Sequence, residues 1–226
     1  MLALKQAISL VSLKNMGWSP VDESSLVAWY RKGVGITLSG SDVQSWDDSS
    51  GNGHTMVQLT ASEMPTYYIP TGNLSFVNAD INNLQTSSQI SLAGQFTVGI
   101  RFYPTAFNNV VIGDNTADGE LFKLTASDRL RIKVDNSATV DLDLDSGSFG
   151  NDYLVITRDG SNVCAFSQNG TLQADTGALS GTIDIDAIGV RKTDLNAYTG
   201  GIKEIQIYSS TSAALTANVN NRLASI

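Results

Sequence analysis

The chain has 226 residues, of which 42% are hydrophobic and 16% are charged, so it can bury a sizeable core and lacks the composition of a disordered protein. Its 22 acidic and 14 basic residues give a net charge of −8, which repels phosphate backbones and anionic membranes and argues against nucleic acid as a partner. The single cysteine, Cys164, excludes an intrachain disulfide and is expected in the core. No window reaches the apolar length of a membrane span, so we expect no membrane insertion.

The N-terminal segment does not fit a signal peptide, because lysines interrupt its apolar stretch and no small-residue cleavage pattern follows. Leu4, Ile8 and Val11 recur at the spacing of one helical face, which predicts a short helix. This helix either packs on its own domain or acts as an arm that docks on a neighbouring subunit. We therefore divide the chain into an N-terminal extension or docking arm over residues 1–19 and one domain over residues 20–226.

Beyond Pro20 the pattern changes to short runs of β-branched and aromatic residues, separated by Gly, Asn, Asp and Ser clusters, which is typical of a sandwich or barrel. Apolar and basic residues alternate over 130–134, as in a strand with one solvated face. Tight turns at Asp159-Gly160 and Asn169-Gly170 leave no room for crossover helices, which disfavours an α/β fold. A final helix is expected after Ser212. The expected strands are 26–30, 55–59, 96–103, 110–112, 121–124, 130–134, 153–157, 163–167 and 202–208.

Two stretches carry a family resemblance. The sequence Leu-Val-Ala-Trp-Tyr over 26–30, followed by Val-Gln-Ser-Trp-Asp-Asp-Ser-Ser-Gly-Asn-Gly-His over 43–54, resembles the opening of laminin-G-like jelly rolls found in many phage structural proteins. Trp29 and Trp46 in these stretches are expected core anchors. The resemblance implies an all-β, concanavalin A-like (laminin-G-like) jelly-roll β-sandwich with short terminal helices. Further matching stretches follow in the family's order at 96–102, 156–160, 167–170 and 200–208.

The resemblance implies a non-enzymatic virion structural protein, such as a head decoration, a fibre or a tail-associated protein. In that role the protein would be located in the virion, and its N-terminal arm would bind capsid or tail proteins. A homo-oligomer is compatible with this interpretation. The fold alone does not settle the function, because jelly rolls of this class serve many roles.

The alternative interpretation is a lectin-like carbohydrate-binding module without a structural role. Sugar binding uses exposed aromatic rings beside polar groups, and the candidate rings are Tyr67, Tyr68, Tyr103 and Tyr198. Each of these tyrosines equally fits a half-buried strand position. The two interpretations are compatible, because a virion surface protein can contact host surface glycans.

The turn after Trp46 offers a candidate metal site. Some members of the resembling family bind calcium with this turn and an acidic residue of the final strand. Here Lys203 stands where that acid would fall, and its ammonium can replace the ion by pairing with Asp47 or Asp48. We therefore expect no cofactor, with calcium held by Asp47, Asp48, Asn52 and Glu204 as the alternative.

The sequence contains no recognisable catalytic motif. Glycoside hydrolases need two carboxyl groups flanking the scissile bond, and the Glu-x-Asp-x-x-Glu motif of β-glucanases on this fold does not occur. Asp141, Asp143 and Asp145, like Asp184 and Asp186, alternate with apolar residues, which predicts a solvated outer sheet face. The single histidine has no nucleophile motif beside it. We expect no enzyme, and a glycoside hydrolase is a distant alternative.

Overall fold

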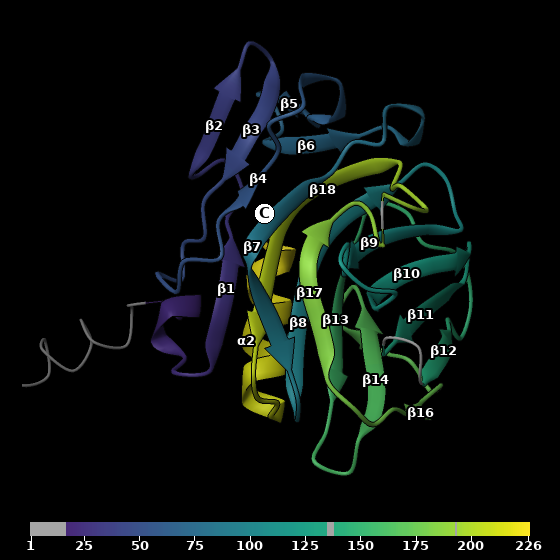
Figure 1. Cartoon of the computed structure of the whole chain (residues 1–226). Coiled ribbons are helices and arrows are strands. Elements are labelled where there is room, and N and C mark those ends of the chain that lie inside the picture. Colours follow the sequence, from purple (N-terminus) through teal and green to yellow (C-terminus); the bar gives the residue numbers. More distant parts are fainter. Residues whose placement is uncertain (1–16, 135–137, 193) are drawn as a thin grey trace, which may run out of the picture.

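The computed structural model describes residues 17–134, 138–192 and 194–226, and it confirms the all-β fold. Every strand pairing is antiparallel, and the strands form two layers that are joined at one end of the molecule (Figure 1). One α-helix, α2, follows the last strand. The predicted arm residues Leu4, Ile8 and Val11 lie outside the described residues. Within the described residues, no helix has the length and apolar character needed to cross a membrane.

The first layer is built around two nine-residue strands that pair with each other, β18 and β8. Its strands, in spatial order, are β1 (Leu26–Tyr30), β18 (Gly200–Tyr208), β8 (Phe96–Pro104), β13 (Asp152–Arg158) and β14 (Val163–Gln168). Two short strands extend the edge of β14, namely β15 (Thr171–Leu172) and β16 (Gly177–Ala178).

The second layer faces the first across the core. Its strands, in spatial order, are β7 (Leu84–Leu92), β17 (Ile183–Ile188), β9 (Asn109–Gly113), β10 (Glu120–Ala126), β11 (Arg129–Lys133) and β12 (Thr139–Asp143). Short strands at the top of Figure 1 link the two layers. These linking elements are β2 (Ile36–Ser39), β3 (Asp42–Trp46), β4 (Met56–Val57), β5 (Thr66–Tyr68) and β6 (Asn73–Phe76), with 3-10 turns η2 (Ala61–Glu63) and η3 (Asn78–Asp80). A further 3-10 turn, η1 (Pro20–Asp22), precedes β1.

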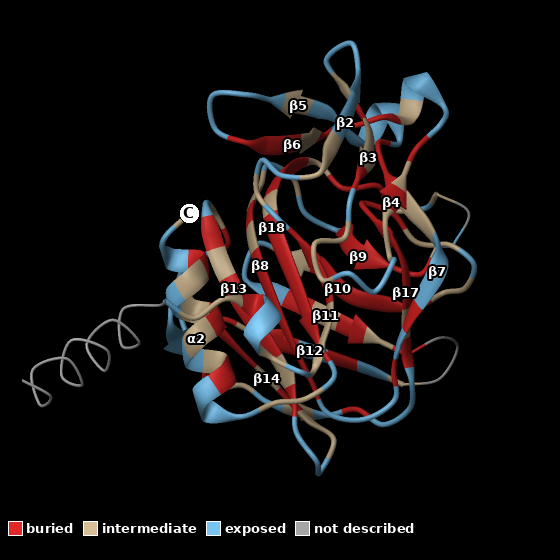
Figure 2. Ribbon diagram, turned by 90° about the vertical axis from the view of Figure 1, so that its left-hand side faces the viewer, coloured by how far each residue is buried: buried red, intermediate tan, exposed pale blue. Residues whose placement is uncertain are grey.

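The core lies between the layers and is built by alternation along each strand. On β8, Ile100 and Phe102 point inward, and on β11 the inward residues are Leu130 and Ile132. Figure 2 shows this buried band running through the middle of the sandwich. Cys164 is buried in the same core, as expected, and burial raises the pKa of its thiol to about 11.

The helix α2 (Ala213–Ala224) packs on the outer face of the first layer, against β8 and β13 (Figure 2). The predicted cap is confirmed, because the Ser212 side chain accepts a hydrogen bond from the Leu215 amide at 3.1 Å. Gly99 lies directly beneath the helix, and a Cβ there would come within 2.4 Å of the Val219 side chain. The absence of a side chain at Gly99 is therefore what lets the helix lie close to the sheet.

A buried carboxylate on β18 fixes the other end of this helix. Glu204 is 0% exposed, and it accepts two hydrogen bonds from the Arg222 guanidinium of α2, at 2.9 and 3.0 Å. It also accepts from the indole Nε1 of Trp29 on β1 at 2.9 Å and from the Gln206 side chain at 2.9 Å. The Arg222 guanidinium in turn lies 5.1 Å from the centre of the Trp29 ring. One carboxylate therefore joins β1, β18 and α2.

We predict that Arg222→Leu lowers the free energy of unfolding by about 3 kcal/mol, because it leaves the Glu204 carboxylate buried without its cation. Urea unfolding followed by tryptophan fluorescence measures the loss. The double variant Glu204→Gln/Arg222→Leu removes both charges and should recover most of it. A loss below about 1 kcal/mol in the single variant would show that the ion pair does not secure the helix.

Candidate functional site

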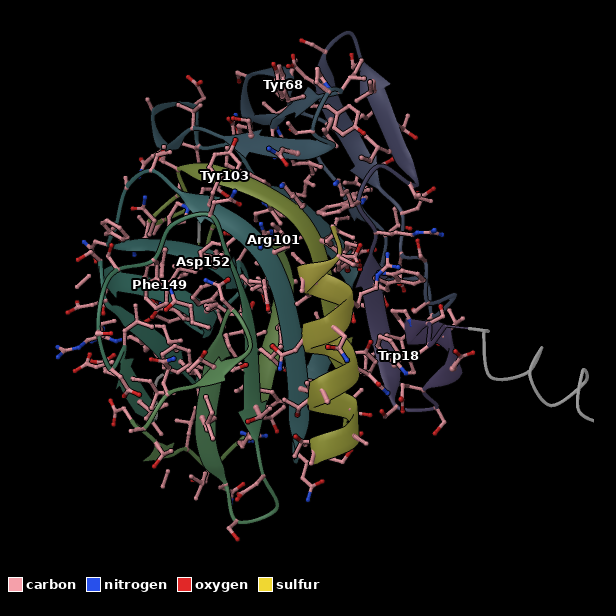
Figure 3. All side chains as sticks on the ribbon, turned by 180° about the vertical axis from the view of Figure 1, so that it is seen from behind. Trp18, Tyr68, Arg101, Tyr103, Phe149 and Asp152 are labelled. Carbon is pink, nitrogen blue, oxygen red and sulfur yellow. The ribbon has the colours of Figure 1, made fainter. Side chains whose placement is uncertain are left out.

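The outer face of the first layer continues beyond the C-terminal end of α2, where the helix no longer covers it. Figure 3 shows Arg101 just past that end, with Tyr103 and then Tyr68 farther along the same side. On β8, Arg101 and Tyr103 alternate with core residues Ile100 and Phe102, so both point outward. The same strand therefore supplies the core and an uncovered polar face.

Tyr103 is held flat against the neighbouring strand. Its backbone partner on β18 is Gly201, and a Cβ built on Gly201 would lie 1.9 Å from the Tyr103 Cε1. The tyrosine ring therefore occupies the space where a side chain would stand, and only glycine permits this position. A ring that is held in this way loses little conformational entropy when it contacts a ligand.

Tyr68 lies on the same face at the edge strand β5. Its register partner on β6 is Asn73, whereas the preceding residue Tyr67 pairs with the core residue Leu74. Alternation therefore turns Tyr67 toward the core and Tyr68 away from it. The Tyr68 side chain is 57% exposed.

A β-bulge in β18 places a lysine beside this face. Ile202 pairs with Phe102 and Glu204 pairs with Arg101, so Lys203 is the extra residue between them. Burial lowers the pKa of Lys203, and the positive charges of Arg101 and Lys32 lower it further. The strand register also places the Lys203 backbone next to Arg101, so these two cations are neighbours.

Lys32 comes from the loop after β1. Its backbone amide donates a hydrogen bond to the Glu204 carboxylate at 3.3 Å, and its aliphatic stem lies 3.2 Å from the Cβ position of Gly72. The loop is thereby held against the face. We call the set Lys32, Tyr68, Arg101, Tyr103 and Lys203 the basic face.

Most other cations in the described ranges form ion pairs, whereas those of the basic face do not. None of the three, Lys32, Arg101 and Lys203, forms an ion pair with a carboxylate there. Elsewhere, carboxylates pair with Lys123, Arg129, Arg131, Lys133, Arg191 and Arg222. Two described cations outside the basic face also lack a carboxylate: Arg158 donates to three backbone carbonyls, and Arg31 lies over the Trp29 ring. A chain of net charge −8 thus keeps a locally positive surface.

Two buried polar atoms at this face have no hydrogen-bond partner within the described part of the chain. They are the Nε of Arg101, a donor, and the Oδ1 of Asn73, an acceptor on β6. Asn73 is only 7% exposed, so its oxygen gains little from solvent. Buried polar groups are ordinarily paired, so at these two atoms the chain leaves a donor and an acceptor unsatisfied.

The structure divides the four predicted sugar-binding tyrosines. Tyr68 and Tyr103 lie on the basic face, whereas Tyr67 is partly buried and packs against the core. Tyr198 was wrongly predicted as a sugar platform: it is 0% exposed, its ring lies 5.9 Å from the Phe76 ring, and burial raises its pKa. A fully buried ring cannot stack on a sugar.

The predicted metal ligands are engaged in other contacts. Asp48 accepts hydrogen bonds from the backbone amides of Trp29 and Ser50, both at 2.9 Å, and Asn52 donates to backbone carbonyls of β1. These contacts describe a structural turn. Asp47 is exposed beside it, and no group of three or more His, Cys, Asp or Glu suited to a metal occurs in the described ranges.

The predicted role of Glu204 in that metal set is wrong, because its cation is Arg222. The predicted substitution of an ion by Lys203 paired with Asp47 or Asp48 is also wrong. Lys203 lies beside Arg101 and Lys32 instead, since the bulge moves it out of simple strand alternation. Calcium binding by the turn alone stays a prediction.

The acidic residues on the second layer are held by neighbouring groups. Asp141 and Asp143 each receive two hydrogen bonds from an arginine on the neighbouring strand, Arg131 and Arg129, and these bonds lower the pKa of both carboxyl groups. Asp186 was expected on a solvated face but is 5% exposed, and burial raises its pKa. The loop after β9 covers it, with Asn115 donating its amide to the carboxylate.

Sequence reasoning missed the cations of the basic face. The alternation of 96–104 could have placed Arg101 and Tyr103 together on the face opposite the core. No sequence pattern indicated the position of Lys32, because this residue lies in a loop. It reaches the basic face through the hydrogen bond from its backbone amide to Glu204.

No family model matches the chain, and no curated protein matches it in sequence. Solved structures match its fold. One is the binding domain of Paraclostridial Mosquitocidal Protein 1, with a TM-score of 0.54, 14% identity, and coverage of 92% of this chain and 53% of that chain. Another is the binding domain of botulinum neurotoxin DC in complex with SialylT, with a TM-score of 0.52, 14% identity, and coverage of 91% and 52%.

A third match is Trypanosoma rangeli sialidase, with a TM-score of 0.52, 13% identity, and coverage of 91% of this chain and 33% of that chain. The chain thus spans about half the length of the toxin binding domains and a third of the sialidase. At this identity the likeness shows the fold alone, and it confirms a β-sandwich. The phage family of the sequence resemblance stays a prediction.

We predict that Arg101→Gln raises the pKa of Lys203, because removing one neighbouring positive charge makes the lysine easier to protonate. Titration of the lysine side-chain signals by NMR measures the shift. Arg129→Gln removes the same charge from an exposed site on the second layer and should leave Lys203 unchanged. An identical titration of Lys203 in wild type and Arg101→Gln would show that the cations are not close neighbours.

Proposed function

We propose that this chain is a carbohydrate-binding domain and that the basic face holds the sugar. The observation that carries the proposal is the pair of tyrosines on one uncovered sheet face, Tyr68 exposed at its edge and Tyr103 fixed over Gly201. Aromatic rings of this kind present a flat apolar surface to the C–H face of a sugar, and neighbouring polar groups bind its hydroxyls.

The polar groups available beside the rings suit sugar hydroxyls. The Asn73 Oδ1 is an unpaired acceptor and the Arg101 Nε an unpaired donor. A sugar hydroxyl both donates and accepts, so it suits donor and acceptor side chains alike. The face thus combines stacking and hydrogen bonding in one place.

We propose binding without cleavage. The carboxyl groups nearest this side of the molecule are occupied by other donors: Glu204 by Arg222 and Trp29, and Asp152 by the side chains of Gln168 and Asn169. A glycoside hydrolase needs one carboxyl group free to donate a proton and a second free to attack or activate water. Neither group has that freedom.

One matched structure supports a sugar ligand, because it is a toxin binding domain in complex with SialylT. That match covers about half of the toxin domain, so it supports the proposal through the fold rather than through matched residues. The virion role, with capsid or tail partners for residues 1–19, stays a prediction that no matched structure named above supports. Host-glycan binding is compatible with it.

We predict that Tyr68→Ala and Tyr103→Ala each weaken glycan binding about tenfold, the loss expected when a stacking ring is removed. A glycan array identifies the ligand, and calorimetry with that ligand measures each variant. Leu172→Ala, which removes another exposed apolar side chain on β15, should bind as wild type does. Absence of binding to every glycan, or unchanged affinity in both tyrosine variants, would contradict the proposal.

A further inference from the structure

We infer that the glycan bound at the basic face carries a negatively charged group, and that Arg101, Lys203 and Lys32 bind that group. This inference rests on the proposed function and adds the chemical class of the ligand. Carboxylate and sulfate groups on sugars share the relevant chemistry, since both are anions with several acceptor oxygens.

The distribution of charge over the molecule favours an anionic ligand. In an acidic chain, carboxylates are plentiful partners, yet the three cations of the basic face lack one throughout residues 17–134, 138–192 and 194–226. The second layer shows the opposite arrangement, because Arg129 and Arg131 there are neutralised by Asp143 and Asp141. The positive charge of the basic face is therefore left for a group outside the chain.

The cations of the basic face also repel one another. The charges of Arg101 and Lys32 oppose protonation of Lys203, which is an unfavourable interaction in the unliganded protein. An anion placed among the three turns each repulsion into an attraction. The nearest buried carboxylate, Glu204, cannot play this part because Arg222 and Trp29 occupy its oxygens.

The Arg101 side chain is placed to bind an anion. The Arg101 guanidinium lies 5.7 Å from the centre of the Tyr153 ring on β13, which steadies its plane, and its Nε has no partner. The terminal N–H groups of a planar guanidinium match two oxygens of a carboxylate. Arg101 is thereby prepared for a bidentate contact.

The separation of Arg101 from Tyr103 suits one sugar. Arg101 and Tyr103 are two residues apart on one strand face, a separation of about 7 Å. That distance is comparable with the width of one sugar ring, so a sugar stacked on Tyr103 can direct an anionic substituent to Arg101. The cations and the rings therefore serve the same ligand.

The experiment compares acidic glycans with their neutral counterparts, using the full chain. Sialyllactose is paired with lactose, a uronic acid oligosaccharide with its reduced form, and a sulfated sugar with the unsulfated one. We expect the acidic member of at least one pair to bind at least tenfold more tightly, with an affinity that falls as salt concentration rises.

Variants assign the effect to residues. Arg101→Gln and Lys203→Gln should each reduce acidic-glycan affinity about tenfold and reduce neutral-glycan affinity by a clearly smaller factor, because only the acidic glycan loses a charge–charge contact. Arg129→Gln makes the same change in net charge on the second layer and serves as the matched control. Loss of affinity in the control as large as in Arg101→Gln would overturn the inference, because general electrostatics would then explain it.

The outcomes separate this inference from the proposed function. Equal binding of acidic and neutral glycans overturns the inference and leaves sugar binding standing. Binding of sulfated but not carboxylated glycans supports it and identifies the anion. Absence of all glycan binding overturns both, as does binding to vesicles of anionic phospholipid without binding to any glycan.

Discussion

The structure outside the sandwich core depends on one buried carboxylate. Glu204 receives the guanidinium of Arg222, the indole of Trp29 and the backbone amide of Lys32, so α2, β1 and the loop after β1 are all fixed to the same point of β18. A charge with 0% exposure is tolerated only because its oxygens are this fully bonded. The helix therefore ends where the basic face begins.

This constraint also explains how the chain divides its charges. The second layer carries cross-strand ion pairs that neutralise one another, such as Arg131 with Asp141. On the first layer, Glu204 forms an ion pair with Arg222. The bulge in β18 places Lys203 beside Arg101 instead of beside a carboxylate. Within the described residues, the first layer thus keeps three cations without a carboxylate partner beside two tyrosine rings, an arrangement that suits the proposed anionic sugar.

Much of the fold could be predicted from the sequence because period-two alternation is a direct consequence of one-sided burial. The strand expected at 26–30 is β1, and the capped helix after Ser212 is α2. The strand β7 was missed because its middle, from Gln85 to Gln89, is polar and offers no apolar run. Tyr198 was misplaced for the converse reason, since alternation does not reveal which side of a loop residue becomes buried.

The basic face was harder to predict because its parts come from separate elements. The most direct test is an NMR titration of the isotope-labelled protein with an acidic oligosaccharide. Our account predicts that the largest shifts fall on Arg101, including its side-chain Nε–H, and on Tyr103, Lys203 and Tyr68. Shifts concentrated on the strands β10 to β12 of the second layer, or spread evenly over the chain, would contradict it.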